Sequence, residues 1–565
     1  MPSSPSLSED LPTPPPAPNE ILQSPSATHH SEDQTGDGNG RTWKGPAPWC
    51  LMSLTSFNQI IWALTSMARL QLYSQLIYPQ VHVTGGLWNV MIHIQDTQPF
   101  FELYLAEKNA HLIDYSRDPV QALINLATVL SLITGILTLL TLAWWGSFSD
   151  RHGRKKMLGI ASIAQFLSSL IVLLVANCVQ IFPGAYWFLI VDAIVLGAVG
   201  GTASEFVTVL TYLSDVATAE KRSRTFSVVL GLLVAGSSIG LKLGDFVLRK
   251  TSSLLSLFYL AAALRIIHAY LVWFILPESL TPEQMHRTSV AHQEIHPSTT
   301  DEPRLWLWFK RFFFFLKPLS MLFPKKVSAE YFPVRRDWSL TILVAASATM
   351  FFVASPLTVL RWLYVLTKFR WGAQKLSHYI DVVNVAHVIS LVLIFPLAFK
   401  FAQKRWTRSN LSRAQSSERE PLLSTTPDVS TTSMFDLGLA RLSVLVMIAT
   451  YLILPLAPTG TIFTLFSVLQ TLGAGFNPAI NSLAFELYTR GIERNGLVES
   501  GKFFAVLSLA SIVVPSGILG QLMYSFIYSA NPGAIFFVGF GNSIIVLVLL
   551  AFISVKPAPR RVSVA

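Results

Sequence analysis

Ionisable side chains interrupt several long apolar runs of this 565-residue sequence. Asp192 and Glu205 lie in one such run, and Arg265 and His268 lie in another. An ionisable group inside a bilayer is costly and usually faces a cavity or a partner, and a carboxyl group in a cavity of low dielectric can exchange a proton near neutral pH. We therefore predict proton sites at both carboxyl groups, with Arg265 pairing with either of them or holding an anionic substrate. The alternatives are a buried ion pair with no transport role and, for His268, ordinary packing.

Two asparagines add amide groups to a further apolar run. Asn477 precedes a proline, which marks a kink with freed backbone carbonyls and suits a helix that lines a cavity. Asn481 occupies the position of Glu205 in an internal repeat, in which LGAVGGTASEFVTVLTYLSD from Leu196 aligns with LGAGFNPAINSLAFELYTR from Leu472. We treat both amides as candidates for a solute site. Because small residues recur in all packed membrane helices, chance is the alternative explanation of the repeat.

The composition indicates a membrane protein. Hydrophobic residues make up 52% of the chain, charged residues make up 13%, and the mean hydropathy is +0.49. A soluble protein carries roughly 25% charged residues, and apolar runs of about 18 residues or more indicate membrane-spanning helices. The net charge of +10 does not predict nucleic-acid binding, because the basic residues lie mostly at the ends of apolar runs.

The sequence does not predict an enzyme. Cys50 and Cys178 have no metal-ligand spacing, and no nucleophile–base arrangement is visible. The phosphate-binding pattern G-x-x-x-x-G-K-[ST] is missing, so there is no case for ATP-driven pumping. We expect no cofactor and no metal, and we predict a proton gradient as the driving force.

About twelve apolar runs are long enough to cross a bilayer. They lie near 49–68, 122–145, 157–180, 185–212, 226–247, 255–276, 338–360, 378–399, 437–456, 460–487, 503–527 and 533–555. Polar residues interrupt the first run, and a long gap after the sixth divides the chain into six plus six. We predict an all-α membrane protein. Its expected parts are a disordered cytosolic tail at 1–45, helical halves at 46–277 and 338–556, a central cytosolic loop at 278–337, a cytosolic insert at 400–436 and a tail at 557–565.

Lysine and arginine set the expected orientation. One set of loops is basic, at 151–156, 221–224, 310–336, 404–408 and 490, whereas the opposite set includes 181–184, 457–459 and 528–532, which have no Lys or Arg. The positive-inside rule therefore places both termini in the cytosol. The four basic residues of 361–375 argue against this orientation, because they fall on the predicted outside.

A dense charge cluster separates the second apolar run from the third, where the sequence reads GSFSDRHGRK from position 146. A tight cytosolic turn explains its basic residues, but it does not explain the adjacent Asp150 and Arg151 or the flanking glycines. A salt bridge at this point could latch one face of the protein and break when that face opens. The predicted gate residues in this stretch are Gly146, Asp150, Arg151, Gly153, Arg154 and Lys155.

This stretch resembles the signature loop of the major facilitator superfamily, G-x-L-x-D-R-x-G-R-[RK], with Phe148 in place of the usual leucine. The resemblance covers most of 49–556. It implies two six-helix bundles around a central cavity, which rock between inward-open and outward-open states. The long loop after the first run and the loop at Asp150 also resemble the tetracycline-efflux-like and proton-coupled folate-carrier-like branches.

Further residues resemble the same family. Asp215 and Arg222 resemble its acidic–basic pair and complete the predicted gate, and Pro277-Glu278-Ser279 resembles the mark that closes the first half. The expected second-half counterpart at 400–408 is basic but lacks the G-x-x-x-D-R core. The second latch is therefore degenerate or absent, and closure is expected to depend on the first half.

The fifth run carries a spaced set of glycines, Gly231, Gly236, Gly240 and Gly244. Their spacing resembles half of the glycine motif of proton-driven drug antiporters. Asp245 stands where that motif has a proline, and its later glycine pair is missing at 248–249. Close helix packing through small residues is at least as good an explanation.

Two loops carry a possible membrane-interface helix and a possible sorting signal. Residues 303–323 are aromatic and basic and could form an amphipathic helix in the membrane interface. If this segment spanned the membrane, the topology of the second half would invert. The residues Glu418, Leu422 and Leu423 resemble an acidic dileucine sorting signal, which would route the protein to an endosomal or vacuolar membrane rather than the plasma membrane.

We predict a monomeric, proton-coupled secondary transporter that exports a small organic solute, such as a drug or a secondary metabolite. The half-matched glycine motif favours export. The alternatives are a proton-coupled importer and a non-transporting sensor with the same fold. Beyond the solute and the lipid bilayer, no partner is predicted.

Overall fold

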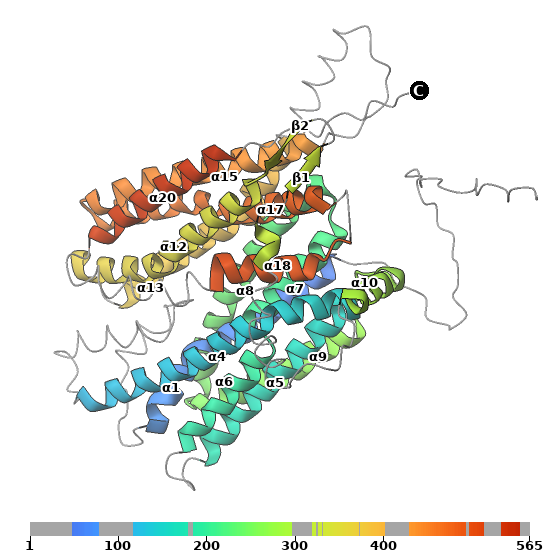
Figure 1. Cartoon of the computed structure of the whole chain (residues 1–565). Coiled ribbons are helices and arrows are strands. Elements are labelled where there is room, and N and C mark those ends of the chain that lie inside the picture. Colours follow the sequence, from blue (N-terminus) through green and yellow to red (C-terminus); the bar gives the residue numbers. More distant parts are fainter. Residues whose placement is uncertain are drawn as a thin grey trace, which may run out of the picture. The chain divides into compact units, whose positions relative to one another are not determined.

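The computed structural model describes residues 48–77, 117–178, 185–295, 319–323, 326–329, 332–371, 373–401, 429–492, 497–513 and 533–553, all within one compact unit, Gly45–Ala565. The described residues are almost all helical (Figure 1). The predicted tails, the segment 303–318, the second-half basic stretch from 402 and the sorting signal at Glu418 lie outside them.

The helices of the first half begin and end close to the expected runs. They are α1 (Pro48–Ile77), α4 (Arg117–His152), α5 (Arg154–Cys178), η2 (Ala185–Phe188), α6 (Leu189–Ala198), α7 (Gly201–Val216), α8 (Ala219–Thr251) and α9 (Leu254–Phe274).

The second half repeats this pattern. Its elements are α12 (Ser339–Phe369), α13 (Ala373–Ile389), the π-helical η4 (Ser390–Ile394), α15 (Val429–Ile453), η5 (Leu454–Leu456), α16 (Gly460–Gln470), η6 (Thr471–Gly475), α17 (Phe476–Ile492), α18 (Ser500–Ser508), the π-helical η7 (Leu509–Val513) and α20 (Ala534–Phe552).

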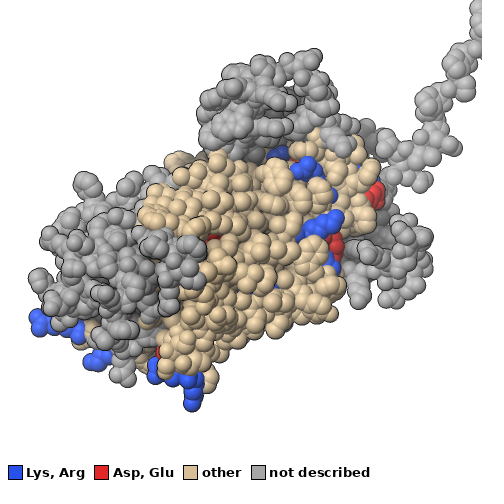
Figure 2. Space-filling view, turned by 90° about the horizontal axis from the view of Figure 1, so that it is seen from below, with Lys and Arg blue, Asp and Glu red and all other residues tan. Residues whose placement is uncertain are grey.

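Each expected apolar run coincides with helix in the described part of the chain. Eight of these helices are long and apolar enough to cross a membrane within the described residues. Large apolar side chains such as Leu174, Phe274 and Leu442 are exposed on them. Figure 2 shows one face largely covered by uncharged residues, with Lys and Arg toward its ends. Such a surface is suited to a lipid environment, and the prediction of a helical membrane protein is confirmed.

Several helix boundaries differ from the expected ones; α1, for example, continues to Ile77, although its run was expected to end near 68. Two further examples lie in the second half. The seventh run was expected to end near 360, but α12 continues to Phe369, so Arg361 and Lys368 are helical rather than part of a loop. In addition, α15 begins at Val429, inside the predicted insert 400–436. In both cases helical hydrogen bonding continues past the end of the apolar stretch, because it does not require apolar side chains.

The central segment contains ordered elements that were not predicted. Helix α10 (Pro282–Ile295) starts with a capping box, in which the amide of Gln284 donates to Thr281 Oγ1 at 3.3 Å and the amide of Thr281 donates to Gln284 Oε1 at 3.1 Å. The strands β1 (Lys326–Ala329) and β2 (Phe332–Arg336) pair in antiparallel fashion. This short hairpin departs from the all-α expectation, and it lies outside the membrane-spanning runs.

The fourth run is a broken helix. α6 ends before Gly200, and α7 begins at Gly201, where the backbone φ angles are +84° and +59°. Only glycine adopts such angles without strain. Side chains of α4 donate hydrogen bonds to the free carbonyls at the C-terminal end of α6. Thr141 Oγ1 donates to the carbonyl of Gly197 at 3.0 Å, and Trp145 Nε1 donates to that of Ala198 at 2.7 Å.

The tenth run breaks at the equivalent place. η6 separates α16 from α17, and it contains the Leu472-Gly-Ala that aligns with the Leu196-Gly-Ala beside the break of the fourth run. The break lies just before the kink predicted at Asn477-Pro478. Pro478 falls in the first turn of α17, where its missing N–H costs no helical hydrogen bond. Both halves therefore depart from regular α-helix at the equivalent point, through positive φ angles in the fourth run and through a 3-10 segment in the tenth.

The glycines of α8 lie where that helix approaches others most closely. A Cβ atom at Gly236, Gly240 or Gly244 would meet the backbone carbonyls of α1, and a Cβ atom at Gly231 would meet Leu391 and Val392 of η4. Close packing thus explains the spacing of these glycines without any reference to drug export.

Candidate functional site

The signature stretch joins the two halves of the chain. Asp150, at the end of α4, accepts hydrogen bonds from the backbone amides of Gly501 at 2.8 Å and Lys502 at 2.9 Å. These amides belong to the first turn of α18, whose N–H groups have no partner within the helix. The carboxylate also meets the positive end of the α18 dipole. A charge in the first half thus caps a helix of the second half.

Arg154 is the centre of this seam. Its guanidinium pairs with Asp150 at 2.7 Å and with Asp215 at 3.0 Å, and it donates to Ser500 Oγ at 2.7 Å. Ser500 Oγ in turn donates to Asp215 at 2.9 Å. The Arg154 side chain is 1% exposed, so the ion pairs are shielded from water and from salt. Residues from α4, α5, α7 and α18 therefore form one closed charge network.

Two glycines of the stretch are needed for this geometry. A Cβ atom at Gly146 would lie 2.6 Å from the carbonyl oxygen of Gly501, so α4 and α18 can approach only without side chains there. Gly153 has a φ of +100°, and a Cβ atom would clash with the carboxylate of Glu278. Glu278 caps α5 by accepting from the amides of Arg154 at 2.8 Å and Lys155 at 3.1 Å.

The Arg151 side chain interacts electrostatically with Glu499, which directly precedes α18 in the second half. Arg151 donates from Nε to the carbonyl of Ser147, within its own helix, at 3.2 Å. Lys155 enters the network only through its backbone amide. The resemblance assigned Arg151 to the latch, but within the described residues Arg154 makes every ion pair of the stretch.

A second ionic contact crosses the seam. Arg222 of α8 pairs with Glu486 of α17 at 3.4 Å, and Glu486 also accepts from Arg490 at 3.2 Å. Asp215 and Arg222 resemble an acidic–basic pair, and the Asp215 charge does act on Arg222, but each forms its ion pair with a residue of another helix, Asp215 with Arg154 and Arg222 with Glu486. The second half thus contributes Glu486 and the α18 N-terminus to the seam in place of a second signature loop.

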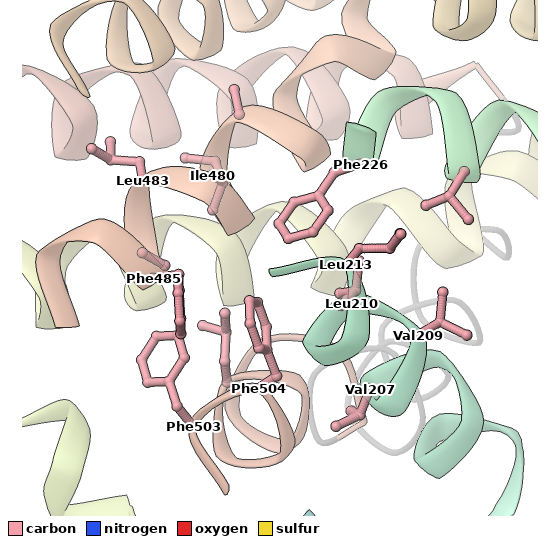
Figure 3. Packing of buried hydrophobic residues seen from close by; sticks show 14 of the residues in the cluster. Val207, Val209, Leu210, Leu213, Phe226, Ile480, Leu483, Phe485, Phe503 and Phe504 are labelled. Atoms are coloured by element: carbon pink, nitrogen blue, oxygen red, sulfur yellow. The ribbon is translucent and has the colours of Figure 1, made fainter. Parts of the chain in front are cut away.

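An apolar core fills the space between these contacts. Figure 3 shows side chains of α7 and α8 facing those of α17 and α18. The Phe226 and Phe504 rings meet edge to face at a centroid distance of 6.0 Å, and Phe485 stacks on Phe504 at 5.2 Å. The Arg222 guanidinium lies 4.6 Å from the centre of the Phe485 ring. Opening the seam would expose this core, so apolar contact and ion pairs favour the same closed state.

A buried polar cluster lies inside the first half. Asn58 donates to both carboxylate oxygens of Glu205, at 2.6 and 2.7 Å, and Gln165 donates to one of them at 2.7 Å. Arg265 donates to the oxygen of Asn58 at 2.6 Å and to that of Gln165. Two amides from α1 and α5 therefore connect an acid on α7 to a base on α9. Opposite charges face each other through neutral dipoles rather than in direct contact.

The other predicted carboxyl group has a different partner. Asp192, 4% exposed, pairs with Arg69 of α1 at 3.4 Å, and Arg69 also donates to Ser168 at 3.0 Å. The Asp192 Oδ1 atom has no hydrogen-bond partner among the described residues. His268 lies 3.2 Å from Ser162 Oγ. Arg265, predicted to pair with either carboxyl group, is linked to Glu205 through the amides of Asn58 and Gln165 and not by a direct ion pair.

The predicted asparagines form a local pair. Asn481 Nδ2 donates to Asn477 Oδ1 at 2.6 Å and to its backbone oxygen at 3.0 Å. Both residues lie in α17, directly after the break at η6. The structure places them away from the Glu205 cluster, on the pseudo-equivalent helix of the second half.

Sequence reasoning missed three members of these clusters. Asn58, Gln165 and Arg69 were noted, if at all, only as interruptions of apolar runs. Polar residues in a span are costly unless they are paired, and this signal could have identified them. No group of three or more potential metal ligands occurs among the described residues.

Known proteins resemble this chain in sequence and in fold. The family model of the Major Facilitator Superfamily matches residues 104–414. The MFS-type transporter avaJ of Aspergillus versicolor is 25% identical, with 93% of this chain and 92% of that protein covered. Multidrug resistance protein 2 of Bacillus subtilis is 32% identical over 27% of this chain and 36% of that protein. The human organic anion transporter MFSD10 (TETRAN) has a similar fold, with a TM-score of 0.59, 13% identity, and 89% of this chain and all of that chain covered.

A multi-pass helical membrane protein with this seam belongs to the class of secondary transporters. The family match covers more than half of the chain, which therefore belongs to the Major Facilitator Superfamily. Members of this superfamily sit in the lipid bilayer and carry small solutes, and they are not enzymes. The resemblance read from the signature stretch is confirmed.

Proposed function

We propose that this chain is a proton-coupled exporter of a small organic solute that works by alternating access. The observation that supports the gating step is the cap that Asp150 places on α18. It links the halves through two backbone hydrogen bonds that must break when this side opens. The Asp150–α18 seam is closed in this structure, so the solute path in this state leads to the opposite side.

Glu205 is the proposed proton carrier. Its carboxylate is balanced by Arg265 only through two amides, so a proton can neutralise it without breaking a direct ion pair. Protonation would weaken the bonds from Asn58 and Gln165, which lie on α1 and α5. The protonation state is thereby linked to the packing of four helices. Asp192, paired with Arg69, is the second proposed site.

The seam is proposed to lie on the cytosolic side, with both termini. Lys368, one of the basic residues that argued against this orientation, donates to the carbonyls of Pro455 at 2.9 Å and Ala457 at 3.1 Å. These carbonyls lie at the C-terminal end of η5, which carries partial negative charge. Lys368 thus has a structural role in helix packing. We therefore give it little weight as evidence against a cytosolic location of the termini.

Export is supported by relatives rather than by geometry. A protein named for multidrug resistance matches part of the chain, and an MFS-type transporter matches nearly all of it. The spaced glycines of α8 do not contribute, because close packing explains them.

The test compares metabolites inside and outside cells that have or lack the protein, with and without a protonophore. We expect at least one compound to accumulate inside cells that lack the protein, and we expect the protonophore to reproduce this accumulation. Glu205→Gln should behave like the loss of the protein, whereas Asp245→Asn, which changes an exposed pair with Arg249, should not. Protein-dependent uptake from the medium would replace export by import. No difference for any compound, despite correct membrane delivery, would favour the sensor.

A further inference from the structure

Arg361 is a basic residue of the second half that lies well inside a helix and forms no ion pair with a described carboxylate. It lies in α12, eight residues before the last residue, Phe369, which corresponds to about 12 Å of helix rise. Its Nε atom is buried and has no hydrogen-bond partner among the described residues. Its charge acts on Tyr379, His387 and Tyr451, and among the described residues no carboxylate acts on these three side chains.

Other basic side chains deep in the described helices are balanced. Arg69 pairs with Asp192 and Arg222 with Glu486, and the exposed Lys242 pairs with Asp381. Arg265 is linked to Glu205 by two amides, and Arg441 donates to the carbonyls of Leu550 and Ile553 at the end of α20. Asp381 is the described carboxylate nearest in sequence to Tyr379. It already forms an ion pair with Lys242.

The groups around Arg361 include unused hydrogen-bonding capacity. Gln470, 7% exposed, lies within hydrogen-bonding reach of the Tyr451 side chain, and its amide nitrogen and oxygen have no other hydrogen-bond partner among the described residues. The hydroxyl of Tyr379 is within hydrogen-bonding reach of Arg361 and donates to Ser467 at 2.9 Å. Arg361 and Gln470 both act on Tyr451, and each has buried polar atoms with spare hydrogen-bonding capacity. Buried polar groups are normally paired, so this capacity points to a missing ligand.

We propose that Arg361 and Gln470 form an anion subsite that binds the carboxylate group of an organic solute. A guanidinium presents two parallel N–H donors that match the two oxygens of a carboxylate, and the Gln470 amide supplies a further donor. The rings of Trp371 and Phe463, which pack on Tyr379, give the neighbourhood an aromatic character. The solute class is therefore an organic acid with an apolar or aromatic body. This assignment deepens the proposed function, because it names the solute class of the same transporter.

The experiment measures binding rather than transport, so it can fail independently of the proposed export. The full chain is reconstituted in lipid nanodiscs, and its Tm is recorded against rising concentrations of benzoate, 2-naphthoate and 4-phenylbutyrate. The corresponding uncharged amides serve as matched ligands. We expect at least one acid to bind wild type at least tenfold more tightly than its amide. In Arg361→Gln the acid should bind about 10- to 100-fold more weakly, the range given by loss of a charge-assisted hydrogen bond.

Two further variants make the test specific. Arg361→Lys keeps the charge but loses the paired donors, so acid binding should weaken by about tenfold while a preference over the amide persists. Arg370→Gln removes an exposed cation at the end of the same helix and should bind like wild type. The ligand-free Tm of each variant reports folding. Equal binding of acids and amides by wild type, or an acid preference that survives in Arg361→Gln, would overturn the proposal.

Discussion

The carboxylate of Asp150 accepts a hydrogen bond from the amide of Gly501 at 2.8 Å, although 351 residues separate them. A side chain usually caps its own helix, whereas here the cap and the helix belong to different halves of the chain. On the proposed alternating-access mechanism, the contact is lost when the two halves open on this side. It therefore ties the stability of one helix end to the conformational state of the whole transporter.

Removing this cap should open the seam. Asp150→Asn keeps the size of the side chain but removes the charge that faces Arg154 and the α18 dipole. Loss of a helix cap costs about 0.5–2 kcal/mol, and breaking a buried ion pair costs about 3–5 kcal/mol. Spin labels at positions 156 and 498, in a background without Cys50 and Cys178, should report longer distances in the variant. Unchanged distances would show that the cap does not hold the seam closed.

The control for this measurement is Asp245→Asn. Asp245 forms an ion pair with Arg249 in which the arginine side chain is 74% exposed. Exposed pairs contribute about 0–1 kcal/mol, so the label distances should match those of the unmodified protein.

Gly153→Ala should destabilise the seam through the backbone. The φ of +100° is strained for alanine, and the new Cβ atom would meet the Glu278 carboxylate. The strain alone costs about 1–2 kcal/mol, and the Tm should fall accordingly. The double variant with Glu278→Ala relieves the clash but also loses the α5 cap, so it should not recover the original Tm. Full recovery would mean that the clash, and not the backbone angle, dominates.

The sequence identified the elements better than their contacts. Twelve apolar runs and the signature stretch follow from composition and spacing, and they locate the helices and Arg154. The ion-pair partners of Asp215 and Arg222 could not be predicted from the sequence, because they belong to helices that are distant along the chain. In helices that are apolar on nearly all sides, periodicity does not indicate which face is inward, so Asn58 and Gln165 were not connected to Glu205. The break at Gly200 depends on a positive φ, which a glycine permits but does not require.

A double-mutant cycle should detect the second contact across the seam. Arg222→Gln leaves Glu486 with Arg490 as its charged partner, and Glu486→Gln leaves Arg222 with only the weaker influence of the Asp436 and Asp215 charges. We expect each single variant to lower the Tm and the double variant to lower it by less than the sum, with a coupling of about 0.5–3 kcal/mol. Arg224→Gln, two residues away and exposed, is the matched control. Additive effects would exclude a direct interaction between Arg222 and Glu486.

In the cluster around Glu205, we predict that removing one charge destabilises the protein more than removing both. Arg265→Gln leaves the Glu205 carboxylate buried without its counter-charge, which costs about 3–5 kcal/mol by analogy with other broken buried pairs. Adding Glu205→Gln removes that charge and should restore much of the Tm. If the double variant is less stable than Arg265→Gln alone, the two charges do not compensate each other through the amides.

The packing of α8 on α1 predicts opposite effects of the same substitution at two glycines. A Cβ atom at Gly240 would meet the carbonyl oxygen of Ile60 and would lie 2.8 Å from the Cβ atom of Ala63, whereas a Cβ atom at Gly135 of α4 has no neighbour within 4 Å. Overpacking costs about 1–3 kcal/mol, while alanine in place of glycine in an open helix position gains up to about 1 kcal/mol. Gly240→Ala should therefore lower the Tm and reduce transport, and Gly135→Ala should leave both unchanged or raise the Tm. Equal responses at the two sites would show that α8 and α1 are not in close contact, and the glycine spacing would again need a functional explanation.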